Sequence, residues 1–568
     1  MRAFLSLLIV AAAFALVCQT SEASEAQAPD ARIEEARQAI GRREFTRAVG
    51  ILSEATQQNP SADAYLYLGI AYANMREFTR AEDTLRDGAR RYPADPRFRN
   101  ELAGTFLARR EPERARAALK EALEVDPTNE YALDLLANID MSEGKVRTAL
   151  DFWNRQDRPI VNEVLHNRYP GFGHWTIPEA MAFEPGEPLR YTDWRTTESR
   201  LFATKLYGNV GVEIEPTARS GYYNVDIRTT SRKTTRESVL FGLAVGLPVQ
   251  TSYLDLWNIR GSGVSLLSQY RWEAQRRLVD VTAHAPIPLP GILFSDSSGI
   301  WRSELWDVSS QAIQPSPADS FIYKSTGGRV MFRHIPSYRL ELAGGWEYRN
   351  RAASGTLPGL ELNSLNSSTA IAETTIVLWD RDKTRSHLHA EGFLARKVFF
   401  GDLDYSGGVV EWGARWSRQR ANRQTSLVSV LSGGMSSGDL PIDEYFVLGV
   451  QTHPRFLLRA HSVTHDGVSG FSPLGTAFVL SNTTLEREIV KIPTFNAANL
   501  PLITVKGELF MDVAKAFDRA GLFREDRIFV DLGLGLQFAT PTHALHLAFG
   551  QSATDGRRAF TAYVEKTW

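Results

Sequence analysis

The chain has 568 residues, which is enough for two to four domains. Its formal net charge is -2 at pH 7, so no overall basic field points to a nucleic-acid partner. The one cysteine is Cys18, in an N-terminal targeting segment, which excludes a disulfide framework in the mature chain.

Residues 1–23 are predicted to be a signal peptide. Arg2 supplies the positive start, and an apolar run of about 15 residues follows over positions 3–17, which is shorter than the ~20 residues of a membrane-spanning helix. Val17 stands where a lipoprotein would need a small residue before Cys18. We therefore expect an exported chain without a lipid anchor.

Residues 31–156 are rich in Ala, Arg and Glu at helical spacing, and they contain an internal repeat. An alanine is followed by a proline 12 positions later, and the alanines are 33, 34 and 34 residues apart. These positions are Ala48 and Pro60, Ala81 and Pro93, Ala115 and Pro127, and then Ala149. With Gly69 and Tyr72 they resemble the tetratricopeptide repeat, in which alanines let paired helices approach closely and prolines end the second helix.

The resemblance is weaker in the fourth unit, where Asp140 replaces the aromatic residue. A helical array of this kind makes a concave surface that binds peptides or partner proteins. The repeats are therefore expected to recruit periplasmic or outer-membrane protein substrates or accessory lipoproteins. A bare spacer is the alternative interpretation.

Residues 157–235 are predicted to be a linker and a small connecting domain. The stretch from Pro159 to Pro188 is rich in proline and is expected to be irregular, either as a linker or as the degraded start of a small domain. A helix with apolar positions at Leu201 and beyond comes next, and two strands follow it. The order of a helix and two strands just before a barrel resembles the last polypeptide-transport-associated (POTRA) domain of BamA-type proteins. The family's Glu-x-Arg-Leu helix pattern falls here on Glu198, Arg200 and Leu201, with a generic α+β linker domain as the alternative.

Residues 236–568 alternate between apolar and small or polar side chains, as the strands of a lipid-embedded barrel do. At roughly 20 residues per strand and connection, this length predicts about 16 strands. The first strand is expected near Ser238–Leu247 and the last at Phe560–Trp568. The expected fold class is α plus membrane β: a helical-repeat solenoid, a small POTRA-like domain and a C-terminal antiparallel transmembrane barrel of about 16 strands.

Two motifs in the barrel region resemble those of the BamA/TamA-type outer-membrane assembly and translocation superfamily, also described as the bacterial surface antigen barrel. That family carries an Arg-Gly-aromatic motif on a loop folded into the barrel and a Phe-x-Asp-x-Gly motif on a late strand, and the arginine pairs with the aspartate. The matching residues here are Leu458, Arg459, Ala460 and His461 on the loop, and Phe510 and Asp512 on the strand.

The alternation on the late strand places Asp512 on the lumen side, and an arginine in a confined lumen needs a carboxylate partner. Ala460 and His461 depart from the family pattern, which has glycine and an aromatic residue there. An alanine would distort the loop if its φ had to be positive.

The end of the chain resembles the terminal strand by which outer-membrane proteins are recognised for insertion. Phe560, Val564 and the final Trp568 carry this signal, although the family usually ends in Phe. The resemblance implies a weak seam between the first and last strands, at which an incoming strand could pair.

No phosphate loop, zinc-binding helix or cysteine pair is present in the sequence, so we expect no enzyme activity and no cofactor. His387, His389 and Glu391 share a strand face, but polar residues facing a lumen are expected in any barrel, and we predict no metal site.

The sequence thus predicts an outer-membrane barrel, in contact with outer-membrane lipid, that inserts or translocates proteins with its repeats in the periplasm. An exopolysaccharide or solute export channel is the alternative, and it would lack the Arg459 and Asp512 motifs. A repeat-plus-barrel translocator of surface lipoproteins with a smaller barrel, and a structural anchor for the repeats, are further alternatives. No nucleic-acid partner is expected.

Overall fold

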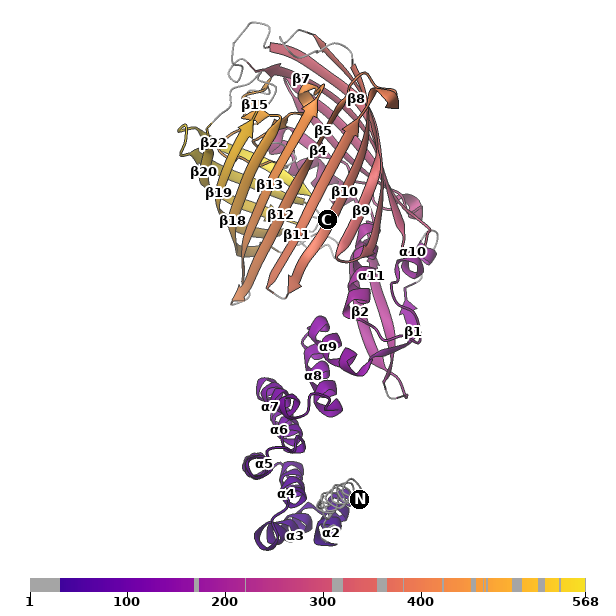
Figure 1. The fold of residues 1–568 in the computed structure, drawn as a ribbon, viewed down its shortest axis with the longest axis vertical. Coiled ribbons are helices and arrows are strands. Elements are labelled where there is room, and N and C mark those ends of the chain that lie inside the picture. The colour runs from indigo at the N-terminus through magenta and orange to yellow at the C-terminus, as the bar shows by residue number, and fades with distance from the viewer. Residues whose placement is uncertain are drawn as a thin grey trace, which may run out of the picture. The chain divides into compact units, whose positions relative to one another are not determined.

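The structure is a computed structural model that describes residues 31–167, 173–219, 221–308, 320–354, 365–381, 383–420, 423–450, 456–462, 464–465, 468–492, 503–518, 527–540 and 543–566 (Figure 1). The predicted signal peptide 1–23 and Trp568 lie outside the described residues. The chain divides into two compact units, Met1–Pro159 and Ile160–Trp568.

The first unit is a row of paired helices, as the repeat predicts. A left-handed residue recurs in the turn inside each pair, at Arg43, Arg76, Arg110 and Gly144. The helices are α2 Ala31–Gly41, α3 Phe45–Gln58, α4 Ala62–Asn74, α5 Phe78–Arg91, α6 Arg97–Ala108, α7 Pro112–Val125, α8 Glu130–Ser142 and α9 Val146–Trp153.

The repeat positions pack the paired helices against each other. Ala81 and Ala115 are fully buried, and a Cβ at Gly69 would lie 2.5 Å from Leu85 Cδ2. Tyr72 packs at the edge of the core around α2 to α4. Pro93 and Pro127 are exposed just beyond α5 and α7, where a residue without an N–H does not continue a helix.

Asp140 is buried in α8, and its carboxylate accepts a 2.6 Å hydrogen bond from Arg116 Nη1 on α7. An ion pair therefore joins these two helices at the position where the other units use an aromatic residue.

The second unit begins with a three-stranded sheet and two helices. Their order is β1 Ile160–His166, α10 Gly173–Ala180, α11 Tyr191–Ala203, β2 Tyr207–Pro216 and β3 Tyr222–Ser231. β3 is central, parallel to β1 and antiparallel to β2. The expectation that 159–188 is irregular is wrong, because this stretch contains β1 and α10. Pro178 lies inside α10, so the prolines there do not prevent a helix.

The expected first barrel strand near Ser238–Leu247 is instead a helix, α12 Arg236–Val245. Thr235 and Ser238 form a capping box, in which each side chain accepts a hydrogen bond from the other residue's backbone N–H. Five alternating residues from Phe241 to Val245 are too few to outweigh this start signal and the helix-forming Leu and Ala.

A closed antiparallel barrel follows, which confirms the helical-repeat and barrel parts of the predicted fold class (Figure 1). Its wall has ten strands from β4 to β13, then five from β18 to β22, and the ring closes between β22 and β4. The strands are β4 Thr251–Tyr253, β5 Ser265–Glu273, β6 Arg276–Ile287, β7 Leu293–Asp307, β8 Ser320–Ser337, β9 Leu340–Ser354, β10 Leu365–Arg381, β11 Thr384–Ala395, β12 Tyr405–Arg420, β13 Arg423–Gly438, β18 Ala477–Ile492, β19 Ile503–Phe517, β20 Phe529–Ala539, β21 His543–Ser552 and β22 Arg558–Lys566.

The wall separates apolar from polar side chains. On β19, Leu509 and Met511 are exposed, whereas Phe510 and Asp512 are buried on the opposite face. Leu532, Leu534 and Leu536 repeat this on β20, where these three leucines are exposed and Asp531 and Gln537 of the opposite face are buried. The outer surface is therefore apolar and the inner one polar. Among the described helices, none combines the length and apolar composition needed to cross a membrane.

Residues 439–476, here called the inner segment, connect β13 to β18 in the sequence, and the described residues among them lie inside the barrel. Their short elements are η6 Ile442–Glu444, β14 Phe446–Val447, β15 Thr464–His465, β16 Val468–Ser469 and β17 Leu474–Gly475. The segment contacts inward-facing side chains of β9 and β19, which are six places apart in the ring. It therefore crosses the lumen.

Replacing Gly69 with alanine should destabilise the repeats although alanine favours helices, because the new Cβ would clash with Leu85. Gly50→Ala in α3 is the control, since nothing lies within 4 Å of its Cβ position. We expect it to stabilise by about 0.5–1 kcal/mol. Urea unfolding followed by far-UV circular dichroism measures both changes. Equal effects would contradict the described packing.

Candidate functional site: the inner segment and its two ionic anchors

Arg459 is the centre of the first anchor. Its side chain is 2% exposed, and Asp512 on β19 is 0% exposed. Arg459 Nη2 donates to Asp512 Oδ1 at 2.6 Å, and Arg459 Nε donates to Oδ2 at 2.9 Å. The backbone N–H of Arg459 also donates to Oδ2 at 3.0 Å. A bidentate pair with a third backbone bond fixes the loop in position and orientation.

The neighbouring strand β18 completes this anchor. Thr484 Oγ1 accepts from Arg459 Nη2 at 3.0 Å, and Asn482 Nδ2 donates to Asp512 Oδ1 at 2.7 Å and to the Leu457 carbonyl at 2.8 Å. The Arg459 guanidinium carbon lies 3.8 Å from the centre of the Phe510 ring. Both charged groups are thus satisfied away from bulk water, which a buried ion pair requires.

Two glycines on β20 and β21 make room, one for the loop and one for the Phe510 ring of β19 that packs against Arg459. A Cβ at Gly550 on β21 would lie 2.8 Å from the Arg459 carbonyl oxygen. A Cβ at Gly533 on β20 would lie 2.4 Å from Phe510 Cζ. The loop backbone and the Phe510 ring therefore pack directly on the barrel wall, and larger residues at these positions would displace both.

Ala460 and His461 use a second carboxylate. Asp531 Oδ2 accepts from the Ala460 N–H at 2.6 Å and lies 3.0 Å from His461 Nδ1. His461 Nε2 lies 3.3 Å from Asp555 Oδ2, and its ring meets Phe529 edge-on. Ala460 is not among the described residues with a positive φ, so alanine in place of glycine introduces no backbone strain.

A second anchor holds the start of the inner segment on β9. Arg351 Nε donates to Asp443 Oδ1 at 2.8 Å, and Arg351 Nη2 donates to Glu444 Oε1 at 2.7 Å. Arg349 Nη1 donates to Asp443 Oδ2 at 2.8 Å. Arg351 and Asp443 are almost completely buried. Sequence reasoning missed this anchor, and the adjacent acids Asp443 and Glu444 in a loop were the available signal.

The predicted helix residues Glu198, Arg200 and Leu201 lie on α11, where the connecting domain meets the barrel. Arg200 Nε donates to the Ile335 carbonyl of β8 at 3.0 Å, and burial lowers the Arg200 pKa. Leu201 is fully buried, and Glu198 pairs with Arg195. The helix is thereby attached to the turn between β8 and β9.

The terminal residues do not share one environment. Phe560 on β22 is 71% exposed, whereas Val564 is 3% exposed, and Trp568 lies outside the described residues. Tyr563 between them stacks on His546 of β21, and the ring centres are 4.5 Å apart. The two described members of the predicted terminal signal therefore differ in their exposure.

Comparison with known proteins finds a match to the tetratricopeptide repeat model over residues 33–95 and 68–130. The comparison with curated proteins finds no match.

Among solved structures, CdiB from Acinetobacter baumannii is 9% identical with a TM-score of 0.48, covering 80% of this chain and 86% of that chain. CdiB from Escherichia coli is 13% identical with a TM-score of 0.47, covering 72% and 76%. BamA from Haemophilus ducreyi lacking POTRA domains 1-3 is 12% identical with a TM-score of 0.41, covering 71% and 83%. These values assign no activity to the chain.

Replacing Asp512 with asparagine should release the inner segment, because it leaves the buried Arg459 cation without its carboxylate, a loss of about 3–5 kcal/mol. Single-channel conductance in planar bilayers and protease cleavage of the segment should both increase. Glu486→Gln is the control, since Glu486 binds Arg415 and Lys506 on the wall. Conductance and cleavage that match those of the control would contradict the anchor.

Replacing Arg351 with methionine should loosen the first part of the inner segment, because Asp443 and Glu444 lose a shared cation. Hydrogen exchange of the backbone amides over 442–448 should accelerate. Arg385→Met removes a mostly exposed arginine that pairs with Asp380 outside the segment, and it should leave these amides unchanged. Unchanged exchange in Arg351→Met would show that the second anchor does not hold the segment.

Proposed function

We propose that this chain is an outer-membrane barrel that inserts or translocates proteins, and that its helical repeats recruit the substrate or a partner. The observation that carries the proposal is the bidentate pair of Arg459 and Asp512 inside the barrel. An export channel for polymers has no need for a loop fixed across its lumen by buried charges, whereas a barrel that opens and closes around a protein needs a stable closed state.

The membrane placement of the barrel is supported by its outer face. The exposed leucines on β20 and the exposed Leu509 and Met511 on β19 would face hydrocarbon. In water, exposed apolar area of this extent would drive aggregation. A bilayer removes that cost, because lipid tails are as apolar as these side chains.

The place where the ring closes supports a role in strand exchange. β4 has three residues, whereas its neighbour β5 has nine. Cβ atoms at Gly242 and Gly246 of α12 would lie 2.7 Å and 2.5 Å from the Tyr253 and Thr251 carbonyl oxygens of β4. The helix therefore packs on the backbone of β4 through its glycines. Because β4 is short, fewer backbone hydrogen bonds between strands break when it separates from a neighbouring strand.

In this proposal the repeats and the connecting domain are in the periplasm. The POTRA-like assignment rests on the order β1, α10, α11, β2 and β3 and on the Arg200 attachment to the barrel. The role is not enzymatic. The free energy for insertion would come from substrate folding and strand pairing, and no nucleotide would be used.

The proposal is tested with the full chain in liposomes. A small outer-membrane barrel unfolded in urea is added, and its folding is followed by the heat-dependent shift of the folded band in gel electrophoresis. We expect faster folding than in liposomes that hold an equal amount of a general porin. Rapid flux of uncharged polysaccharide without faster folding would instead favour the export channel.

Deleting residues 31–156 should leave a barrel that still shows a heat-dependent gel shift but no longer retains its partner, because the repeats form a separate compact unit. The measurement compares the proteins that co-purify with the full chain and with the truncated chain after crosslinking. Full retention of the same partner by the truncated chain would move the recruiting role to the connecting domain or the barrel.

A further inference from the structure

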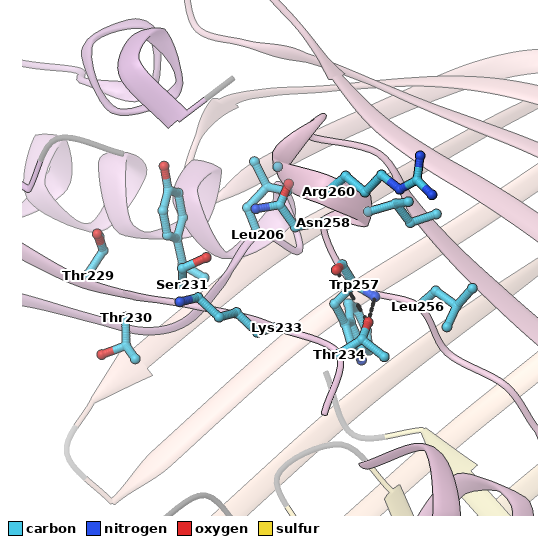
Figure 2. A pocket seen from close by; sticks show the side chains of 13 residues that line it. Leu206, Thr229, Thr230, Ser231, Lys233, Thr234, Leu256, Trp257, Asn258 and Arg260 are labelled. Atoms are coloured by element: carbon cyan, nitrogen blue, oxygen red, sulfur yellow. Dashed lines mark hydrogen bonds between the residues drawn. The ribbon is translucent and has the colours of Figure 1, made fainter. Parts of the chain in front are cut away.

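A cavity of about 860 Å³ lies where the connecting domain meets the first strands of the barrel (Figure 2). Its walls are the start of β2, the end of β3 and the segment after β4. Thr234 joins two of these walls, since its hydroxyl accepts a 2.7 Å hydrogen bond from the Trp257 N–H. This volume is within the range of small-ligand sites.

The lining of the cavity is amphiphilic. Leu206, Tyr207, Leu256, Trp257 and Ile259 supply an apolar surface, and hydroxyl groups of the β3 end face the same space. The thirteen described residues that line it include two cations, Lys233 and Arg260, and no acid. In Figure 2, Lys233 extends between the β3 end and Trp257, and Arg260 lies beyond Asn258.

A third cation lies behind this wall. The Arg232 guanidinium stacks on the Trp257 ring, 4.6 Å from its centre, and its buried Nη1 has no hydrogen-bond partner among the described residues. Burial lowers the pKa of Arg232, and the charge of Asp255 opposes this shift. Asp255 also lies 3.5 Å from His543 Nε2 and does not line the cavity.

The cavity is beside the apolar outer surface of the barrel. Leu254, two residues before the first lining residue of this segment, is exposed, and Tyr270 on the adjoining strand β5 is exposed as well. The Leu254 N–H donates to Ser268 on β5 at 3.2 Å, which places it on the wall. An aromatic and cationic site at the end of an apolar wall is typical of a membrane interface.

We propose that this cavity binds an anionic glycerophospholipid of the periplasmic leaflet. The positive charges of Lys233 and Arg260 would attract the phosphate from two sides of the cavity, and an acyl chain would occupy the apolar part beside Trp257. The inference rests on the proposed membrane placement of the barrel, but not on protein insertion. A lipid held there would brace β3 against the segment that leads from β4 to β5.

Native mass spectrometry of the full chain in detergent tests the inference, with dioleoylphosphatidylglycerol and dioleoylphosphatidylcholine as probes. We expect at least a fivefold preference for the anionic lipid, and loss of this preference in Lys233→Gln/Arg260→Gln. The matched control is Arg219→Gln/Arg228→Gln, which removes two exposed cations from β3 and the turn before it. This control should retain the preference.

Two further binding measurements identify the ligand. Glycerophosphoglycerol, the headgroup without acyl chains, should bind at least tenfold more weakly than the lipid. Ser231→Phe, which fills the cavity, should reduce lipid binding with the cations in place. Equal binding of both lipids, equal loss in the two charge variants, or stronger displacement by an acidic peptide than by free lipid would overturn the proposal.

The folding assay in liposomes keeps this test separate from the proposed function. A chain that accelerates folding but shows no anionic preference would contradict only the lipid site. A chain with the preference but without folding activity would contradict only protein insertion.

Discussion

The structure depends on one buried ion pair, between Arg459 of the inner segment and Asp512 of β19. A guanidinium removed from water is costly unless a carboxylate and further hydrogen bonds replace its hydration. Asp512, Thr484 and the Phe510 ring provide that replacement. The pair therefore has one favourable geometry, and it determines where the loop crosses the lumen. Asp443 and Glu444, near the start of the segment, form a second buried ionic arrangement with Arg351 of β9, so the segment is held at two points by buried ion pairs.

The wall is adapted to this loop. Gly550 and Gly533 have no side chain where the Arg459 carbonyl and the Phe510 ring approach, and Asp531 accepts from the Ala460 N–H. These contacts come from β20 and β21, next to the last strand. Any movement of the last strands would consequently strain the loop. A displaced loop would leave the buried carboxylates of Asp512 and Asp531 without the hydrogen-bond donors that the loop supplies. This coupling connects the proposed opening of the ring to the state of the lumen.

Sequence reasoning succeeded where a pattern extends over many residues, and where a buried charge requires a partner of opposite charge. The repeat period predicts the helical array, and the alternation predicts the barrel over many strands. Asp512 could be placed on the lumen side because its strand alternates cleanly. Short elements were missed. The five alternating residues in α12 fit a helix equally well, and the prolines in 159–188 led to the prediction of an irregular segment where α10 forms. The second anchor and the role of Gly550 depend on contacts between the inner segment and strands far from it in sequence, which a single sequence does not display.

A double-mutant cycle on Arg459 and Asp512 tests the central claim most directly. Arg459→Met, Asp512→Asn and the double variant are compared in the rate at which the full chain folds an unfolded barrel in liposomes. If the pair acts as one unit, the double variant should be no slower than the worse single variant, because the second change removes a charge that already lacks its partner. Independent, multiplicative losses would show that the two residues act separately and would contradict the account.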